Sequence, residues 1–284
     1  MSNTPGILYI VATPIGNLAD ITERALQTLR DVDVIAAEDT RHSARLLAHY
    51  GISTRCVALH EHNERNAADG LISRLQQGKS IALISDAGTP LISDPGFYLV
   101  RAVQQASCRV VPIPGASALI TALSVAGLPS DRFSFEGFLP AKREARRRAL
   151  EALSDESRTL IFYESTHRIF DALQDMAAVF GEQRQAAVVR ELTKTFETVR
   201  RDHLGALCEW MAADDNQRRG EFVLLIHGAE NEQSLEQVEI DPKALLVEFM
   251  ALQPPKAAAA TVAKLTGLKK NALYELGLTL KPKS

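Results

Sequence analysis

The chain has 284 residues, of which 46% are apolar and 24% are charged, an ordinary globular composition that predicts about two domains. A formal net charge of −3 argues against a protein that binds nucleic acid over its whole surface. No stretch approaches the roughly 20 apolar residues of a membrane span, and the first residues do not resemble a signal peptide, so we expect a cytoplasmic protein without membrane contact.

Between Gly6 and Pro112, short apolar runs alternate with segments of helical period. This alternation predicts a parallel sheet with crossover helices. The first helix is expected to begin at a capping box, with Asp20 as the N-cap and Glu23 three residues on. The next two helices, over 40–50 and 64–77, should each end at a glycine, Gly51 and Gly78. The predicted strands are 7–12, 32–37, 56–59, 81–85 and 109–113.

The pattern changes after Gly115, where an apolar helical segment leads into a second series of strands and helices. Strand 196–201 follows strand 186–192 after a short connection, so the second sheet is expected to be mixed, with some antiparallel pairing. We therefore predict two α/β domains, over 1–115 and 116–228.

The last part of the chain differs in composition. Residues 229–242 are polar and acidic, as in a linker. Residues 243–284 contain three short helical patterns, and the turn Thr266-Gly267-Leu268 is typical of a helix-turn-helix-like hairpin. A small basic helical unit is predicted there.

Several common ligand motifs are incomplete. The loop after the first strand has only Gly16 where a dinucleotide-binding fold requires GxGxxG, and the Gly-Lys-Ser at 78–80 lacks the glycine that a phosphate-binding loop requires at Ser73. The three cysteines are far apart, and the two histidines of the segment HEHNE, residues 60–64, have no further ligands nearby. No metal site is predicted.

Charged residues gather where predicted strands end. They lie in three segments: AAEDTR (36–41), FYESTHR (162–168) and RELTKTFE (190–197). Two interpretations stay open: the strand ends converge on one cleft between the domains, or their charges cap helices and form ion pairs.

The segment at 81–96 contains one acidic turn twice: Ser85-Asp86-Ala87-Gly88 and Ser93-Asp94-Pro95-Gly96. The first copy ends a strand and is expected to face a ligand. The second precedes a helical pattern, so Ser93 or Asp94 is expected to be an N-cap, with Pro95 in the first turn.

Two basic segments interrupt the acidic chain. One, at 141–148, has five basic residues against Glu144, and the other is the lysine-rich tail. A solvated helix face is one interpretation, and contact with a folded RNA at defined places is the other. The RNA-binding candidates are Lys142, Arg143, Arg146, Arg147, Arg148, Lys264, Lys269 and Lys270.

Taken together, the ordered motifs resemble the tetrapyrrole methylase superfamily and, within it, its RNA-modifying branch. The resemblance covers residues 6–227 and depends on VATPIGNL, AAEDTR, HEHNE, LISDAGTPLISDPG, VPIPGASA, FEGFLP, FYESTHRI, RELTKTFE and GEFVLLI. It implies S-adenosylmethionine in a cleft between two α/β domains, and a homodimer. It also implies a substrate, the ribose 2′-hydroxyl of a cytidine in the decoding centre of 16S ribosomal RNA.

The resemblance also assigns site residues. The implied cofactor-binding residues are Thr13, Pro14, Ile15, Gly16, Asp86, Gly88, Thr89, Ser117, Ala118 and Tyr163. The candidates for a general base are Glu38, Asp39, His60 and Glu61, at the carboxyl edge of the predicted sheet. Arg41, Arg168 and Lys194 are candidates for holding phosphate or lowering the pKa of the hydroxyl.

Two alternatives remain. The same fold could methylate a small corrin or porphyrin precursor, although such an enzyme would not need the basic segments. The chain could also be a noncatalytic ribosome-assembly factor that binds RNA, against which the intact loops at Pro14, Asp86 and Ser117 argue.

Overall fold

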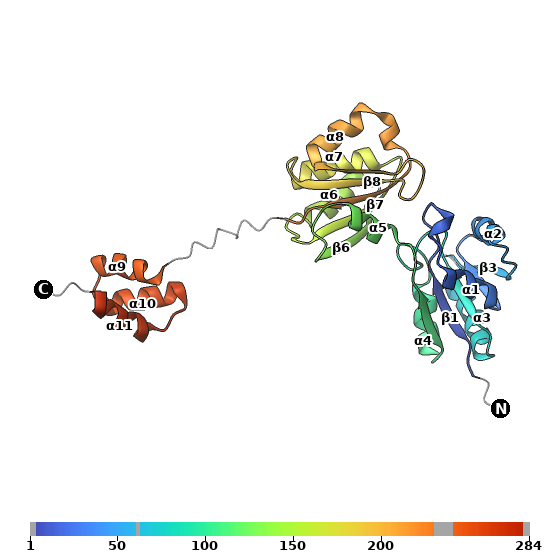
Figure 1. Cartoon of the computed structure of the whole chain (residues 1–284), viewed down its shortest axis with the longest axis horizontal. Helices are drawn as coiled ribbons and strands as arrows, with labels where there is room; N and C mark the ends of the chain where they lie inside the picture. The colour runs from blue at the N-terminus through green and yellow to red at the C-terminus, as the bar shows by residue number, and fades with distance from the viewer. Residues whose placement is uncertain (1–3, 61–62, 230–240, 281–284) are drawn as a thin grey trace. The chain divides into compact units, whose positions relative to one another are not determined.

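The computed structural model describes residues 4–60, 63–229 and 241–280. The chain divides into two compact units, residues 1–229 and 230–284 (Figure 1). The first unit contains two five-stranded sheets with helices on their faces, and the second contains helices. These observations confirm the predicted fold class.

The first sheet is parallel throughout, as predicted, with strand order β3-β2-β4-β1-β5. Its central strands β2 and β4 are buried on both faces, which explains their continuous apolar sequences. The strands are β1 (Ile7–Val11), β2 (Val34–Ala37), β3 (Cys56–Ala58), β4 (Ile81–Ile84) and β5 (Arg109–Ile113).

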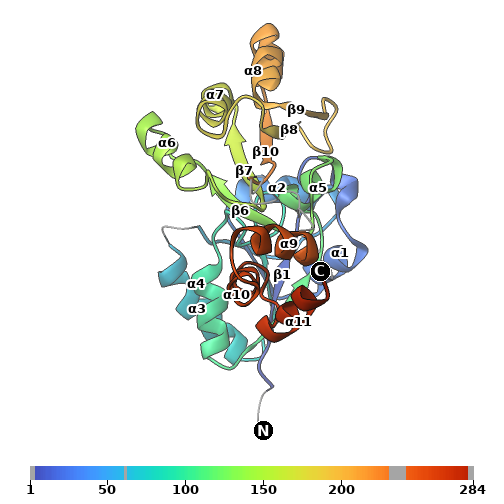
Figure 2. The same cartoon turned by 90° about the vertical axis from the view of Figure 1, so that its left-hand side faces the viewer.

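Helices cover both faces of this sheet. On one face α1 (Glu23–Asp31) and α2 (Thr40–His49) pack around Leu29, Ile35 and Leu47. On the other, α3 (Glu64–Gln76) and α4 (Phe97–Gln105) lie side by side (Figure 2). The neighbouring strands β1 and β4 therefore send their connections to opposite faces. Such a switch point opens a crevice at the carboxyl ends of the strands.

The structure corrects the predicted start of α1. Thr22 is the N-cap, and its side-chain oxygen accepts a hydrogen bond from the Ala25 backbone nitrogen. Asp20 instead belongs to the short 3-10 helix η1 (Leu18–Asp20), and Glu23 is the first residue of α1. The capping box was wrong because two good capping residues stand two positions apart. The predicted glycine ends are confirmed, since Gly51 and Gly78 both have positive φ.

The predicted start of α4 is also wrong. Gly96 is the N-cap, with φ of +129°, and neither Ser93 nor Asp94 caps the helix. A Cβ atom on Gly96 would lie 2.7 Å from Leu83 Cδ2, so the helix begins directly against the sheet at a position that only glycine fits. The turn before it is left outside the helix, at the edge of the crevice.

The second sheet is mixed, as predicted, with strand order β6-β7-β10-β8-β9. β6 and β7 are parallel, and the other neighbouring pairs are antiparallel. Its strands are β6 (Phe133–Phe138), β7 (Thr159–Ser165), β8 (Gln185–Arg190), β9 (Thr198–His203) and β10 (Glu221–Ile226).

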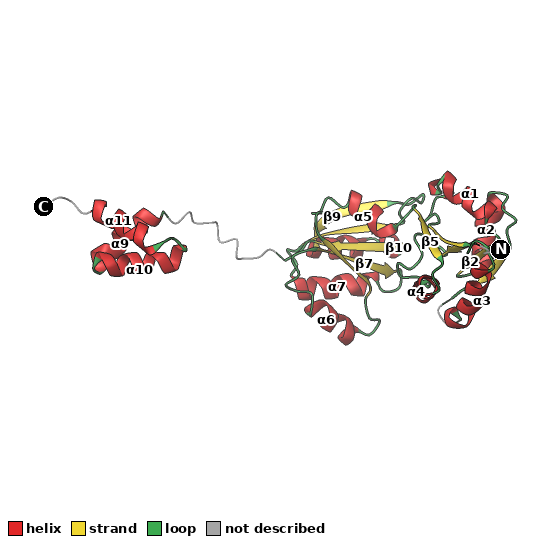
Figure 3. Cartoon of the chain, turned by 90° about the horizontal axis from the view of Figure 1, so that it is seen from below, coloured by secondary structure: helices red, strands yellow, loops and turns green. Residues whose placement is uncertain are grey.

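Different helices pack on the two faces of the second sheet. One face packs against α6 (Arg143–Glu151), α7 (Ile169–Phe180) and α8 (Leu204–Ala213), and η2 (Asp215–Arg218) follows α8. The other packs against α5 (Ala118–Val125), as Figure 3 shows. Ile15, from the first domain, also packs against this second face. The two domains therefore meet on the α5 side of the second sheet.

The second unit consists, in its described part, of α9 (Pro242–Leu252), α10 (Pro255–Thr266) and α11 (Lys270–Leu280) around Leu246, Val262 and Leu273. Gly267 ends α10 in the left-handed conformation, in the predicted turn. Most of the predicted linker, 229–242, lies outside the described residues. Nowhere in the described parts of the chain is a helix long and apolar enough to cross a membrane.

Candidate functional site

Two loops at the switch point are joined by backbone hydrogen bonds. Thr13 follows β1 and Gly88 follows β4, and their backbone nitrogens and oxygens pair at 2.8 and 3.0 Å. The buried Thr13 hydroxyl also donates to the Ser85 carbonyl at 3.2 Å. The Asp86 turn is therefore held in place from both ends.

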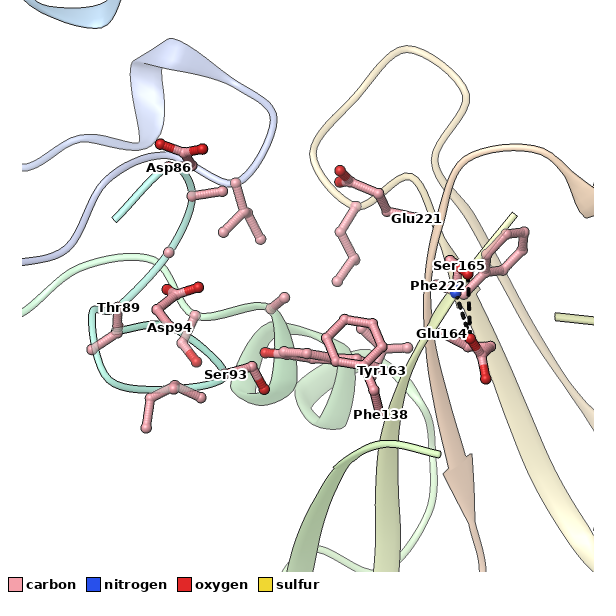
Figure 4. Close-up of a pocket in the computed structure, with 18 of the residues that line it drawn as sticks. Asp86, Thr89, Ser93, Asp94, Phe138, Tyr163, Glu164, Ser165, Glu221 and Phe222 are labelled. Atoms are coloured by element: carbon pink, nitrogen blue, oxygen red, sulfur yellow. Dashed lines mark hydrogen bonds between the residues drawn. The ribbon is translucent and has the colours of Figure 1, made fainter. Parts of the chain in front are cut away.

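A pocket of about 440 Å³ lies where these loops face the second sheet (Figure 4). We call it the main pocket. The first domain contributes Asp86 and Asp94 on one side, and the second contributes Phe138, Tyr163 and Glu221 on the other. Seven predicted cofactor-binding residues line it: Ile15, Asp86, Gly88, Thr89, Ser117, Ala118 and Tyr163. The other three, Thr13, Pro14 and Gly16, line a neighbouring pocket instead.

Three carboxylates from the first domain, those of Glu38, Asp86 and Asp94, reach the main pocket. Burial raises the pKa of Asp94 to about 6, and the nearby charges of Glu38 and Asp86 add to this rise against a hydrogen bond from Ser85. Burial, followed by the charge of Asp86, also raises the pKa of Glu38. This wall of the pocket therefore has negative potential suited to a cationic ligand.

Tyr163 makes the contacts that stabilise the opposite wall of the main pocket. Its hydroxyl accepts a hydrogen bond from the Leu119 backbone nitrogen at 3.1 Å, in the first turn of α5. Its ring contacts Phe135 and Phe138 edge-on, with centroids 4.8 and 5.7 Å apart. Together with the hydrogen bond from Thr89 Oγ1 to the Ala116 carbonyl, these contacts fix the segment that presents Ser117 and Ala118.

Asp94 lines the main pocket, although its place in the sequence predicted a helix cap. Its turn has the same Ser-Asp-x-Gly pattern as the first copy, and that pattern also suits a helix start. What places Asp94 in the pocket is backbone geometry, with positive φ at Leu91 and Ser93 and the late helix start at Gly96. The only sequence signal was the repetition of the acidic turn itself.

The four candidate general bases differ in their position relative to the main pocket. Glu38 lines the main pocket, whereas Asp39 is the N-cap of α2 and accepts a hydrogen bond from the Arg41 backbone nitrogen at 2.8 Å. Hydrogen bonds from Arg41 lower the pKa of Asp39, and the two form an ion pair of 3.2 Å at the surface. His60 is exposed and lines neither pocket, and Glu61 lies outside the described residues.

The cationic candidates of the second domain are already paired. Arg168 contacts the Glu164 carboxylate at 3.2 Å and donates to the Leu139 carbonyl. The ammonium group of Lys194 lies 2.9 Å from both Glu191 and Glu221. Of the two interpretations of the strand ends, convergence on one cleft holds for Glu38 and Glu164, which both line the main pocket. Capping or ion pairing holds for Asp39, Arg41, Arg168 and Lys194.

The basic segment at α6 is not uniform. Lys142, Arg143 and Arg148 are exposed and Arg147 is half-buried, but Arg146 is 3% exposed and lies 2.7 Å from the buried carboxylate of Asp175 on α7. Arg146 was therefore wrongly included among the RNA-contacting candidates, because its charge is used inside the domain. In the second unit, Lys264, Lys269 and Lys270 are all exposed.

Comparison with known proteins identifies the family. Residues 7–208 match the family model described as Tetrapyrrole (Corrin/Porphyrin) Methylases, and residues 236–281 match the model described as RsmI C-terminal HTH domain. Among solved structures, a Thermus thermophilus uroporphyrin-III-C-methyltransferase has a TM-score of 0.56 at 19% identity and covers 78% of this chain and 94% of its own. A diphthine synthase has a TM-score of 0.59 at 16% identity, covering 78% and 90%. These likenesses concern the fold.

Curated relatives are much more similar. A protein of Haemophilus influenzae named "Ribosomal RNA small subunit methyltransferase I" is 58% identical over 98% of both chains. Proteins of the same name from Escherichia coli O157:H7 and Pseudomonas aeruginosa are each 56% identical, over 97% and 98% of this chain and 96% and 99% of their own. The chain therefore belongs to the tetrapyrrole methylase family and, within it, to the group of ribosomal RNA small subunit methyltransferase I.

Proposed function

We propose that the chain transfers a methyl group from S-adenosylmethionine to the ribose 2′-oxygen of a cytidine in 16S ribosomal RNA. The observation that carries this proposal is the 56–58% identity, over nearly the full length of both chains, to relatives named for methylation of small-subunit ribosomal RNA. The chain is a methyltransferase on the same grounds, with ribosomal RNA as its substrate.

The main pocket fits the cofactor. S-adenosylmethionine, when bound, supplies an activated methyl group on a sulfonium centre. A volume of about 440 Å³ lies within the usual range for small-molecule sites. Asp86, Glu38 and Asp94 offer carboxylates for the ligand's positive charges and hydroxyls, and Ser117 lies at the N-cap of α5. Val189, Leu192 and Val223 provide an apolar surface on the second domain.

Asp94 suits the role of proton acceptor for the substrate hydroxyl. A ribose hydroxyl is a weak nucleophile at neutral pH, and a general base typically contributes about 10² to 10⁴ in rate when its pKa lies near the working pH. Asp94 has a pKa of about 6 and lines the main pocket. Asp39, whose pKa is lowered, is committed to the start of α2.

The remaining expectations belong to the same proposal. The exposed Lys142 and Arg148, the half-buried Arg147, and the exposed Lys264, Lys269 and Lys270 of the second unit would bind RNA phosphates. Action on the small ribosomal subunit implies a cytoplasmic enzyme. The homodimer implied by the family can be checked by analytical ultracentrifugation.

The deciding experiment offers labelled S-adenosylmethionine with three substrates: free 16S RNA, small subunits and whole ribosomes. Substrates from cells that lack the modification should accept one methyl group, which mass spectrometry of nucleosides would place on the ribose of a cytidine. Label on a base would overturn the 2′-oxygen assignment. No label on any of the three substrates, with label on a tetrapyrrole precursor, would favour the small-molecule alternative.

A further inference from the structure

A second pocket, of about 300 Å³, adjoins the main pocket. It lies on the other side of the loop after β1 and is bounded by α2 and by the loop after β8. Ile15, Asp86, Ala87 and Glu221 line both pockets and form their shared wall. A ligand in the second pocket would therefore lie directly beside a ligand in the main pocket.

The walls of the second pocket are mostly apolar. Pro14 and Ile15 come from the loop after β1, Leu18 begins η1, and Leu46 comes from α2. Tyr50 donates a hydrogen bond to the Leu18 carbonyl, which ties the loop to the end of α2. Flat heteroaromatic rings bind well between such surfaces.

Polar groups in this pocket are available to a ligand. Ser43 is 2% exposed and lines the pocket, and its hydroxyl oxygen has no hydrogen-bond partner among the described residues. His42 lies one residue earlier, also in the lining. An unpartnered buried hydroxyl is uncommon in proteins, and a bound ligand with donors and acceptors would satisfy it.

One basic side chain in the lining of the second pocket forms no ion pair with any described residue. Lys194 is neutralised by Glu191 and Glu221, at 2.9 Å each. Arg45, exposed on α2, lines the pocket and forms no ion pair with any described residue. An exposed guanidinium beside an apolar pocket suits a base with a phosphate attached to it.

We propose that the second pocket receives the nucleoside whose ribose is methylated, and that Arg45 holds an adjoining phosphate of the RNA chain. This inference rests on the proposed function, because it takes the substrate to be RNA. A base that is paired and stacked in a helix cannot enter such a pocket, so the target must be unstacked or extruded, as in other enzymes that act on single nucleotides. Because the two pockets share a wall, the ribose of a nucleoside in the second pocket would then lie beside the main pocket.

The first test fills the second pocket with a larger side chain and leaves the lining of the main pocket unchanged. Leu46 lines the second pocket alone, so Leu46→Trp should obstruct the base. Ala48→Trp is the matched control, because Ala48 is exposed on the same helix and lines neither pocket. We expect Leu46→Trp to lower kcat/KM for small subunits at least tenfold, while calorimetry gives an unchanged Kd for S-adenosylmethionine. Ala48→Trp should behave as wild type.

Arg45→Ala gives a milder second test that cannot fail through misfolding of the pocket. It should weaken binding of small subunits and reduce the slope of log K against log salt by about 0.7, the value for one contact with single-stranded phosphate. Wild-type kinetics in both Leu46→Trp and Arg45→Ala would overturn the inference. A loss of S-adenosylmethionine affinity in Leu46→Trp would also overturn it, because the cofactor would then be the ligand of the second pocket. Failure of the proposed function itself would show separately, as absence of methylation by the wild-type enzyme.

Discussion

The proposed role of Asp94 as general base links its protonation to catalysis. Because a base must be deprotonated to accept a proton, kcat/KM should rise with pH through about 6 and level off above it. Asp94→Asn should remove this rise and lower kcat/KM about 100-fold or more. Initial rates with small subunits from pH 5 to 8 would measure both effects.

Two variants control for the neighbouring carboxylates. Asp86→Asn removes a like charge beside Asp94, so the rise should move to lower pH at saturating cofactor. Glu38→Gln should do the same. If Asp94→Asn keeps the rise while Glu38→Gln loses it, Glu38 is the base and the assignment to Asp94 is incorrect.

Gly16 shows how a single residue lets the two domains approach. A Cβ atom there would lie 2.6 Å from Lys194 Cγ and 2.8 Å from the Leu192 carbonyl oxygen. Gly16→Ala should therefore push the loop after β8 away and reduce the free energy of unfolding by about 1–3 kcal/mol, the usual cost of overpacking. Chemical denaturation followed by circular dichroism would measure it.

Gly70→Ala is the matched control for this change. Gly70 lies inside α3, and a Cβ atom there would have no neighbour within 4 Å. Alanine is the better helix former, so this variant should gain about 0.5–1 kcal/mol. An equal loss of stability in both variants would show that close packing at Gly16 is not the cause.

Helix α6 is anchored to α7 by a buried ion pair. The side chains of Arg146 and Asp175 are 4% and 2% exposed, whereas Arg143, which also contacts Asp175, is 72% exposed. Arg146→Ala should cost about 3–5 kcal/mol, because it leaves a buried carboxylate without its buried partner. Arg143→Ala should cost less than about 1 kcal/mol, since exposed ion pairs contribute little. Equal costs in thermal unfolding would contradict this account.

The elements also show what the sequence could and could not predict. Strands and helices followed from apolar alternation, whereas the residues of the main pocket around Asp86 and Ser117 were implied by the family resemblance that these contiguous motifs carry. Burial of Arg146 could not be foreseen, because its partner Asp175 lies 29 residues away on another helix. The place of Asp94 depended on backbone conformation, which two identical turn patterns do not distinguish.

Under the proposed function, the two compact units would carry out different tasks. The first unit contains the main pocket, and the second presents exposed lysines together with exposed Leu265 and Leu268 near the turn between α10 and α11. A unit with a separate basic surface can add RNA affinity without altering the cofactor site. Under the proposed function this surface would contact RNA phosphates, and the effect of such contacts on affinity depends on salt.

Reversing three charges of the second unit in the full chain tests this division. Replacing Lys264, Lys269 and Lys270 with glutamate should weaken small-subunit binding and flatten its salt dependence by about 2–3 in log–log slope, because roughly 0.7–0.9 is lost per phosphate contact. The Kd for S-adenosylmethionine should not change, because the main pocket is lined by residues of the first unit. Replacing the exposed Arg55, Arg101 and Arg109 of the first unit with glutamate changes the net charge equally and serves as the control. If both triple variants weaken binding to the same degree, net charge alone would explain the effect, and the second unit would not be a distinct RNA-binding surface.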